Sequence, residues 1–415
     1  MMELQELQEE VRVLRSELIR KDVIIKGLLS TLRQTAITTN ESGGMRSSTV
    51  LQERPTMSTL PLLESTNAST LGVFPMGNLS GLFVGCETTG LSACCGRSAV
   101  VDLITIGVMK GGTTSLEGNI QDLPNYCRSA SPEAHFFDDQ LSADPVSGTQ
   151  LGEYERKQWG RCEPQWPRFE KSPNYFVQEY TPLRICEALG PQQKLLVILR
   201  EPGARSFSEF AHHATVSSAG GRYHNAGIPP TPSGFDTLVE IEVAIVRHCG
   251  ATPGPYFSPE QIPNSTLAPW EQCCLKQAAR HGFYSWPGCT CSPVGLKTKS
   301  GWCHQYGQQH LVVIRSSLYE IHLRKWLRYF PPSSLMIFRS EDLFDHGEAM
   351  TAQLLRWSSP NYAIPPRIVP HHYLTKSRNL DPMSASTRTL LTEFFAPYNA
   401  RLEDRLGTKM NWPVP

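Results

Sequence analysis

Short apolar segments alternate with helical patterns from about residue 101 onward, and this alternation restricts the fold more than any other feature. The segments are LITIGV (103–108), LLVIL (195–199) and LMIF (335–338). Continuous apolar runs of this length, separated by helical stretches, are typical of strands in a parallel sheet that is covered on both faces. The sequence therefore predicts a three-layer α/β fold, with a central parallel sheet flanked by helices. Ligands of such sheets bind beyond the carboxyl ends of the strands.

The first apolar run leads into a glycine- and hydroxyl-rich loop and then into a helical pattern. The loop consists of Lys110, Gly111, Gly112, Thr113, Thr114 and Ser115. A strand-to-helix turn leaves backbone N–H groups without partners, and glycine, hydroxyl groups and a lysine favour the close approach of an oxyanion. The loop is predicted to bind phosphate or sulfate, with a plain Gly-rich turn as the alternative. It is P-loop-like but no Walker A sequence, because Lys110 precedes the glycines, and this argues against an ordinary kinase or ATPase.

The second apolar run is followed by Arg200, and Ser208 lies on the helix predicted after it. An arginine at a strand end binds phosphate in a bidentate manner, and a serine on the next helix can add its hydroxyl. Taken alone, Arg200 would more often be a surface salt-bridge residue. Two anion sites at neighbouring strand ends predict a ligand with two separated anionic groups, such as a nucleotide phosphorylated at both its 5′ and 3′ positions.

Several motifs occur in the order, and near the spacing, found in carbohydrate sulfotransferases. They are KGGTTSL, SPEAHFFDD, KSPNYF, KLLVILREPGARSFSEF, SLYEIHLRKWLRYFP and KSRNLDPMSASTRTLLTEFFAPYNARLEDRLG. The chain resembles this family over about residues 101–412. Within it, RNLDPM followed by PYNARL is similar to N-acetylgalactosamine 4-sulfate 6-O-sulfotransferases, and EAHFFD is similar to heparan sulfate sulfotransferases.

This resemblance implies in-line transfer of a sulfuryl group from 3′-phosphoadenosine 5′-phosphosulfate to a hydroxyl of a carbohydrate, either glycosaminoglycan-like or another polysaccharide, without a metal. It implies that residues 110–115 hold the 5′-phosphosulfate and that Arg200 and Ser208 bind the 3′-phosphate. Lys376 and Arg378 match a basic loop that closes over this co-substrate.

The resemblance also implies catalytic roles. Glu133 matches a glutamate base of the heparan-type members, and Lys171 matches a lysine that faces the reacting groups. The reaction needs a proton acceptor for the hydroxyl, and cations such as Lys110 and Lys171 for charge on the bridging oxygen. Glu133 is the expected base and His135 the alternative, because both would point to one face of an extended strand. Without the resemblance, a salt-bridged carboxylate and a core histidine would be the better interpretation.

The chain divides into three predicted parts. Residues 1–34 carry a heptad seam interrupted by Lys21, which predicts a coiled-coil stalk and a homo-oligomer, with a lone amphipathic helix as the alternative. The seam consists of Leu4, Leu7, Val11, Leu14, Leu18, Ile25, Leu28 and Leu32. Residues 35–98, rich in Ser, Thr, Gly and Asn, are predicted to be a flexible linker, and residues 99–415 the sulfotransferase domain.

Within that domain, residues 215–310 are predicted to be an irregular Cys- and Pro-rich insertion held by disulfides. Its cysteines are Cys249, Cys273, Cys274, Cys289, Cys291 and Cys303. Their spacing fits no C-x₂-C pair well, so no metal is expected.

Composition restricts partners and location. A net charge of +0 gives no reason to expect a nucleic-acid partner. No run of about 18 apolar residues is visible as a transmembrane anchor. The 12 cysteines do not decide the redox compartment, because cytosolic chains can carry many thiols. The secretory pathway, and so the Golgi lumen and a glycoprotein, is favoured over the cytoplasm by N-x-[ST] sequons at Asn40, Asn67, Asn78 and Asn264.

Two other functions are compatible with parts of this pattern. A sulfotransferase acting on a small alcohol or phenol would fit the lack of a visible anchor. A catalytically silent glycan-binding protein would fit the stalk, but it would have no need for the whole set of Lys110, Glu133, Lys171, Arg200 and Ser208.

Overall fold

The computed structural model describes part of the chain: residues 73–74, 100–138, 146–215, 228–249, 313–373 and 380–412. These residues all belong to a compact unit, Glu64–Pro415. Four predictions lie outside the described residues: the coiled coil over 1–34, the linker over 35–98 apart from residues 73–74, the basic loop with Lys376 and Arg378, and every insertion cysteine except Cys249.

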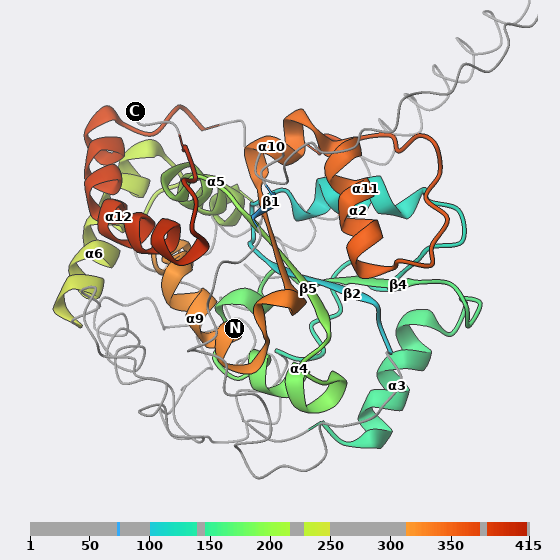
Figure 1. The fold of residues 1–415 in the computed structure, drawn as a ribbon. Helices are drawn as coiled ribbons and strands as arrows, with labels where there is room; N and C mark the ends of the chain where they lie inside the picture. Colours follow the sequence, from blue (N-terminus) through green and yellow to red (C-terminus); the bar gives the residue numbers. More distant parts are fainter. Residues whose placement is uncertain are drawn as a thin grey trace, which may run out of the picture. The chain divides into compact units, whose positions relative to one another are not determined.

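A six-stranded sheet forms the middle layer (Figure 1), in the order β1-β6-β5-β2-β4-β3. The strands are β1 (Val73–Phe74), β2 (Leu103–Gly107), β3 (Cys127–Arg128), β4 (Arg168–Lys171), β5 (Lys194–Leu199) and β6 (Leu335–Arg339). The three predicted strands are neighbours, because β5 pairs in parallel with both β2 and β6. The predicted parallel sheet is thus confirmed. The edge strand β1 is antiparallel to β6, and its two residues lie within the segment predicted as a linker.

Helices cover both faces of the sheet, as the three-layer prediction requires. They are α2 (Thr113–Gln121), α3 (Gly148–Trp159), α4 (Thr181–Leu189), α5 (Pro202–Thr215), α6 (Pro232–His248), α9 (Tyr319–Tyr329), α10 (Ser340–Asp345), α11 (Gly347–Ser358) and α12 (Ala385–Leu406). Helices α2 and α11 pack on one face, and α4 and α9 on the other (Figure 1). Helices α5, α6 and α12 share a third apolar cluster beside the sheet.

The strand β5 shows why an uninterrupted apolar run suits this position. Leu196 and Ile198 belong to the core cluster beneath α2 and α11, whereas Leu195, Val197 and Leu199 belong to the cluster beneath α4 and α9. Successive side chains of a strand point to opposite faces, so a strand between two helical layers buries every residue.

The segment predicted as an irregular insertion contains a regular helix, α6. Thr231 caps it by accepting a hydrogen bond from the Gly234 N–H at 3.2 Å, and a proline occupies its first turn. Its buried Glu242 accepts hydrogen bonds from the N–H groups of Val313 and Ile314, at 3.2 and 2.7 Å. The prediction of irregular structure is therefore wrong for residues 232–248, because their apolar face packs against α5 and α12.

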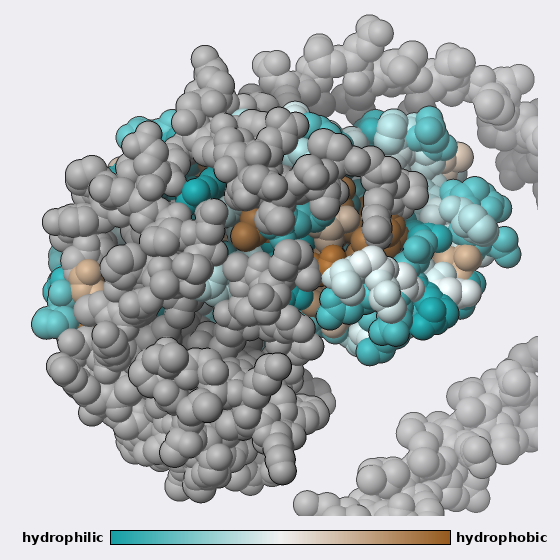
Figure 2. Space-filling view, turned by 90° about the horizontal axis from the view of Figure 1, so that it is seen from below, coloured by the Kyte–Doolittle hydropathy of each residue, from teal (hydrophilic) through white to brown (hydrophobic). Residues whose placement is uncertain are grey.

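A disulfide joins Cys127 of β3 to Cys162, which follows α3. The predicted disulfides involved only the insertion cysteines, so this pair was not among them. Of those insertion cysteines, Cys249 is disulfide-bonded. The space-filling view in Figure 2 shows hydrophilic residues over much of the visible described surface, with smaller hydrophobic areas between them.

Candidate functional site

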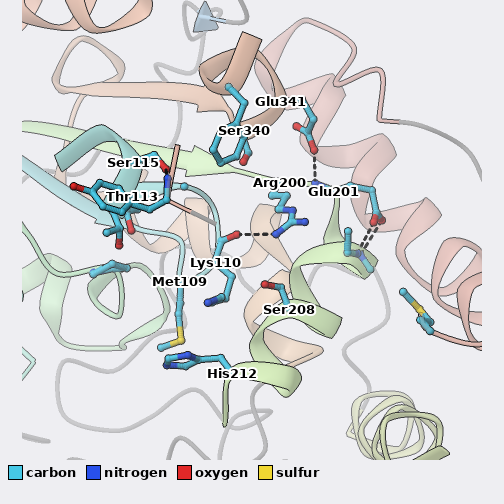
Figure 3. Close-up of a pocket in the computed structure, with 18 of the residues that line it drawn as sticks. Met109, Lys110, Thr113, Ser115, Arg200, Glu201, Ser208, His212, Ser340 and Glu341 are labelled. Atoms are coloured by element: carbon cyan, nitrogen blue, oxygen red, sulfur yellow. Dashed lines mark hydrogen bonds between the residues drawn. The ribbon is translucent and has the colours of Figure 1, made fainter. Parts of the chain in front are cut away.

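A cavity of about 670 Å³ brings together residues that follow β2, β5 and β6 (Figure 3). Its lining includes most of the predicted site: Lys110, Gly112, Thr113, Thr114, Ser115, Glu133, Arg200 and Ser208. Ligand sites in parallel sheets form at this edge, because the carboxyl ends of the strands meet there. Segments that lie far apart in the sequence therefore meet at one cavity.

The loop after β2 adopts a conformation that depends on glycine. Gly112, the N-cap of α2, has a φ of 102°, and Lys110 has a φ of 66°. A Cβ atom on Gly111 would collide with the carbonyl oxygen of Ile198 in β5. The loop thus lies close against the sheet. The Ser115 N–H already donates to the Gly112 carbonyl oxygen at 3.0 Å. The N–H groups at the very start of a helix have no acceptor within the helix, which makes this edge of the cavity suited to an anion.

Positive charge surrounds one part of the cavity. Figure 3 shows the side chains of Lys110, Arg200 and Ser208 directed toward the same space. The Arg200 guanidinium donates a hydrogen bond to the Lys110 carbonyl oxygen at 3.3 Å, and the Tyr319 hydroxyl donates to the Arg200 carbonyl oxygen at 2.8 Å. Burial, reinforced by the nearby Arg200 charge, lowers the pKa of Lys110 despite the opposing effect of Glu209. An anion bound here would raise the pKa of Lys110 again, because a nearby negative charge favours the ammonium form.

Arg205, which was not among the predicted site residues, supports the loop after β2 from outside the cavity. It is buried on α5 and donates hydrogen bonds to the Met109 carbonyl at 3.2 Å and the Ser317 hydroxyl at 2.6 Å. Its charge is paired with Glu209 at 2.6 Å. It therefore fixes the backbone just before Lys110. The sequence feature that could have identified Arg205 was an arginine on the buried face of a predicted helix.

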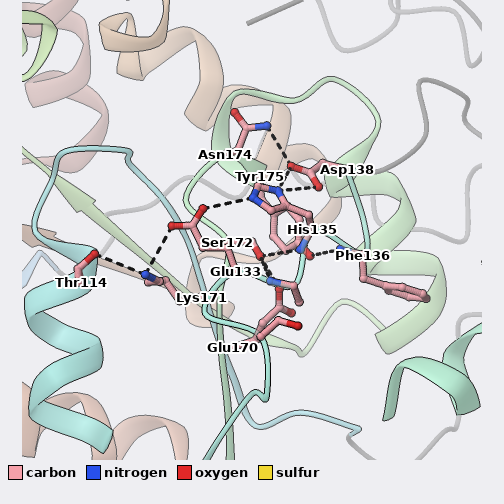
Figure 4. Close-up of polar contacts among 12 residues, drawn as sticks. Thr114, Glu133, His135, Phe136, Asp138, Glu170, Lys171, Ser172, Asn174 and Tyr175 are labelled. Carbon is pink, nitrogen blue, oxygen red and sulfur yellow. Dashed lines mark hydrogen bonds and ion pairs between the residues drawn. The ribbon is translucent and has the colours of Figure 1, made fainter. Parts of the chain in front are cut away.

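Six side chains of alternating charge, here called the charge chain, cross the neighbouring part of the site. In order they are Arg128, Glu117, Lys171, Glu133, His135 and Asp138, and the distances between successive charged groups are 3.4, 2.9, 3.5, 3.2 and 3.0 Å. Figure 4 shows the part from Lys171 to Asp138. The structure thus brings together Lys171, Glu133 and His135, as predicted, although only Glu133 of these lines the cavity.

The segment with Glu133 and His135 bends without regular structure and leads into a turn over residues 136–138, so the assumption of an extended strand is wrong. His135 has a φ of 50°. Its N–H and that of Ala134 both donate to the Ser172 hydroxyl at 3.1 Å, and the Phe136 N–H donates to the Tyr175 hydroxyl at 2.9 Å. The backbone N–H groups of this segment thus bond to side-chain hydroxyl groups, where those of a strand would bond to a neighbouring strand.

Hydrogen bonds decide the charge states of the two candidate bases. Burial alone would lower the pKa of His135, but hydrogen bonds to Asp138 and Glu133 raise it to about 10. Burial alone would raise the pKa of Glu133, but the contacts with His135 and Lys171 lower it. At neutral pH the imidazole is thus protonated and the carboxylate is ionised. Only the carboxylate is then in a state to accept a proton.

Further cavity residues come from the C-terminal part of the chain and were not predicted. Arg388 of α12 adds a third cationic side chain to the lining. Phe344 and Tyr373 line it as well, and they stack on His372 and His371, with ring centroids 5.7 and 5.8 Å apart. The Tyr373 N–H donates to the Ser115 hydroxyl at 3.1 Å, which ties this segment to α2.

Within the described part of the chain, no group of three or more His, Cys, Asp or Glu side chains is arranged to hold a metal ion. Over the same residues, no helix combines the length and the apolar character needed to cross a bilayer.

Comparison with known proteins adds relatives of one kind, although no family model matches the chain. The chain is 25% identical to heparan sulfate glucosamine 3-O-sulfotransferase 5 of Mus musculus and of Homo sapiens, over 75% of this chain and 73% of each relative. It is 23% identical to the membrane-associated sulfotransferase kil1 of Dictyostelium discoideum, over 75% of this chain and 66% of that protein. A crystal structure of a sulfotransferase from Alicyclobacillus acidocaldarius matches with a TM-score of 0.44 and 18% identity, covering 76% of this chain and 98% of that one, a similarity too low to argue from.

Proposed function

We propose that this protein, which belongs to the carbohydrate sulfotransferase family, transfers a sulfuryl group from 3′-phosphoadenosine 5′-phosphosulfate to a hydroxyl group of a carbohydrate. One observation carries the proposal. A single cavity joins the anion-binding turn after β2, with Arg200 and Ser208, to the ionised carboxylate of Glu133. Such a site can bind a doubly anionic donor at one end and activate a hydroxyl at the other.

The donor would occupy the cavity with its two anionic ends apart. Residues 110–115 would hold the 5′-phosphosulfate through N–H groups, hydroxyls and the Lys110 ammonium. Arg200 and Ser208 would bind the 3′-phosphate, and Arg388 faces the same cavity. Phe344 offers an aromatic surface for the purine. A volume of about 670 Å³ is in the range of nucleotide-sized pockets.

Transfer would proceed by in-line displacement. The acceptor oxygen attacks sulfur while Glu133 takes its proton, and the bond between sulfur and the bridging oxygen breaks with its electron pair remaining on the 5′-phosphate. Lys110 and Lys171 would stabilise the charge that develops on the bridging and sulfuryl oxygens. Because contacts with His135 and Lys171 lower the pKa of Glu133, it is a weak base, and the proton would move only as the new S–O bond forms.

His135 would then act through Glu133 and not as the base itself. Protonated, it donates from one ring nitrogen to Glu133 and from the other to Asp138, at 3.2 and 3.0 Å. Asn174 donates to the same Asp138 oxygen at 3.0 Å. This arrangement orients the carboxylate toward the cavity and keeps it ionised.

The acceptor is proposed to be a sugar chain. Two of the relatives are named for heparan sulfate, which favours a glycan over a small alcohol or phenol. The ionised Glu133 side chain is 40% exposed, so an acceptor can reach it from solution. A silent glycan-binding protein would have no use for a carboxylate that lines this cavity and contacts the ammonium of Lys171.

The location proposed is the secretory pathway, and within it the Golgi lumen. The Cys127–Cys162 disulfide supports an oxidising compartment. The stalk over residues 4–32 remains a prediction of oligomerisation. Removing it should lower the mass measured by light scattering, and an unchanged mass would contradict it.

A labelled-sulfate assay tests the function. Donor carrying ³⁵S is incubated with the protein and with desulfated heparan sulfate, chondroitin, other polysaccharides and, for comparison, 2-naphthol. Label is expected in a polysaccharide and not in naphthol. Labelling of naphthol alone would favour the small-molecule alternative, and binding of polysaccharide without labelling of any acceptor would favour the silent protein.

A further inference from the structure

We infer that Glu117 is a positioning residue of this site, which holds the Lys171 ammonium between the carboxylate of Glu133 and the start of α2. The inference rests on the proposed function, because it concerns a lysine that acts in the transfer step. Glu117 itself does not line the cavity, and it would act only through Lys171.

Lys171 has three neighbours that pull its ammonium in different directions. Its Nζ atom lies 2.9 Å from a Glu117 oxygen, 3.5 Å from a Glu133 oxygen and 3.4 Å from the Thr114 hydroxyl. The side chain is only 4% exposed, so water contributes little to its solvation. The shortest of these contacts, the one to Glu117, therefore has the largest influence on where the ammonium lies.

Glu117 lies between two cations. It is buried on α2, and its other carboxylate oxygen lies 3.4 Å from the Arg128 guanidinium. Arg128 is 42% exposed on β3, and its guanidinium contacts the carboxylate oxygen that does not face Lys171. Each cation offsets part of the cost of burying the carboxylate, so the two contacts together hold Glu117 beside Lys171.

The two carboxylates compete for one ammonium. If Glu117 were neutral, Glu133 would be the only carboxylate near Lys171, and the ammonium would move toward it. That movement would neutralise the proposed base and place a cation where the acceptor hydroxyl has to approach. It would also take the ammonium away from Thr114, which lines the cavity at the proposed sulfuryl position. Glu117 thus keeps the base available and the cation near the transferred group.

The charged groups around Lys171 come from three segments. Glu117 lies on α2, Glu133 and His135 lie in the segment after β3, and Arg128 lies beyond Glu117. Neutralising Glu117 removes a negative charge from this set and leaves two cations beside Glu133. The loss of the Glu117 charge and the approach of the Lys171 ammonium would both lower the proton affinity of Glu133, so both would weaken it as a base.

The test is Glu117→Gln, which keeps the shape and removes the charge. With desulfated heparan sulfate, or the polysaccharide that the wild type labels best, kcat should fall on the order of tenfold, less than the 10²-fold that a 1 Å misplacement can cost. The dissociation constant of 3′,5′-ADP, measured by calorimetry, should stay the same. In a Lys171→Ala background the substitution should have no further effect, because Glu117 would act only through the ammonium.

Two more variants make the result specific. Glu117→Asp keeps the charge and should recover part of the lost kcat. Glu155→Gln breaks a comparable pair with Arg168, at 2.6 Å and outside the cavity, and should leave kcat unchanged. Equal losses in the Asp and Gln variants, or a full tenfold loss in the Lys171→Ala background, would show a structural role and overturn the inference. A wild type that neither binds 3′,5′-ADP nor labels any acceptor would instead overturn the proposed function.

Discussion

The Nζ atom of Lys171 lies 3.5 Å from a carboxylate oxygen of Glu133, and this contact joins the carboxyl end of β4 to the segment that follows β3. It places an ammonium group and a carboxylate beside the cavity that is lined by the loop after β2.

Glu133→Gln is expected to lower kcat by about 10²-fold or more, because the amide cannot accept the proton of the acceptor hydroxyl. The affinity for 3′,5′-ADP should change little, since this product carries no group that needs the base. Steady-state kinetics and calorimetry measure the two quantities. Wild-type kcat in this variant, together with loss of activity in His135→Ala, would transfer the role of base to His135.

Arg200→Ala is expected to weaken binding of 3′,5′-ADP by roughly 1.5–3 kcal/mol, the typical effect of losing a charge-assisted hydrogen bond. Affinity for 5′-AMP, which lacks the 3′-phosphate, should change much less. Arg356→Ala, at an exposed position of α11 outside the cavity, is the matched control. Unchanged 3′,5′-ADP affinity in a folded Arg200→Ala variant would remove Arg200 from the site.

His135→Gln should remove a pH-dependent contribution to stability. The hydrogen bonds to Asp138 and Glu133 raise the pKa of His135 from 6.5 to about 10 in the folded protein. The resulting stabilisation is complete below about pH 6.5 and is lost as the pH rises toward 10. The melting temperature of the wild type should therefore fall more steeply than that of the variant between pH 6.5 and 10. If the melting temperatures of the wild type and the variant changed equally with pH across this interval, the imidazole would not be held protonated.

Replacing Cys127 and Cys162 together by serine should lower the free energy of unfolding by about 3–4 kcal/mol, because the disulfide closes a loop with a sequence separation of 35. Denaturant titration measures this loss. Binding of 3′,5′-ADP should persist below the new midpoint, since neither cysteine lines the cavity. An unchanged unfolding free energy would mean that the bridge adds nothing to stability.

Local patterns in the sequence were enough to predict three strands of the sheet and to single out the loop that lines the cavity. The three apolar runs are β2, β5 and β6, because a strand buried on both faces needs no polar residue. The loop after β2 was identifiable because its glycines, hydroxyls and lysine are consecutive. The strand-end position of Arg200 followed from the same rule. In each case, the physical cause acts within a few residues of chain.

Tertiary structure alone decided the partners of the charged side chains. Glu117, Lys171 and Glu133 come from three segments of the chain. Only the pairing of β4 with β2 and β3 brings the Lys171 ammonium within 4 Å of both carboxylates. The conformation at His135 depends on the hydroxyl groups of Ser172 and Tyr175, which follow β4. Charge states and long-range contacts depend on distance in space, and a sequence gives only distance along the chain.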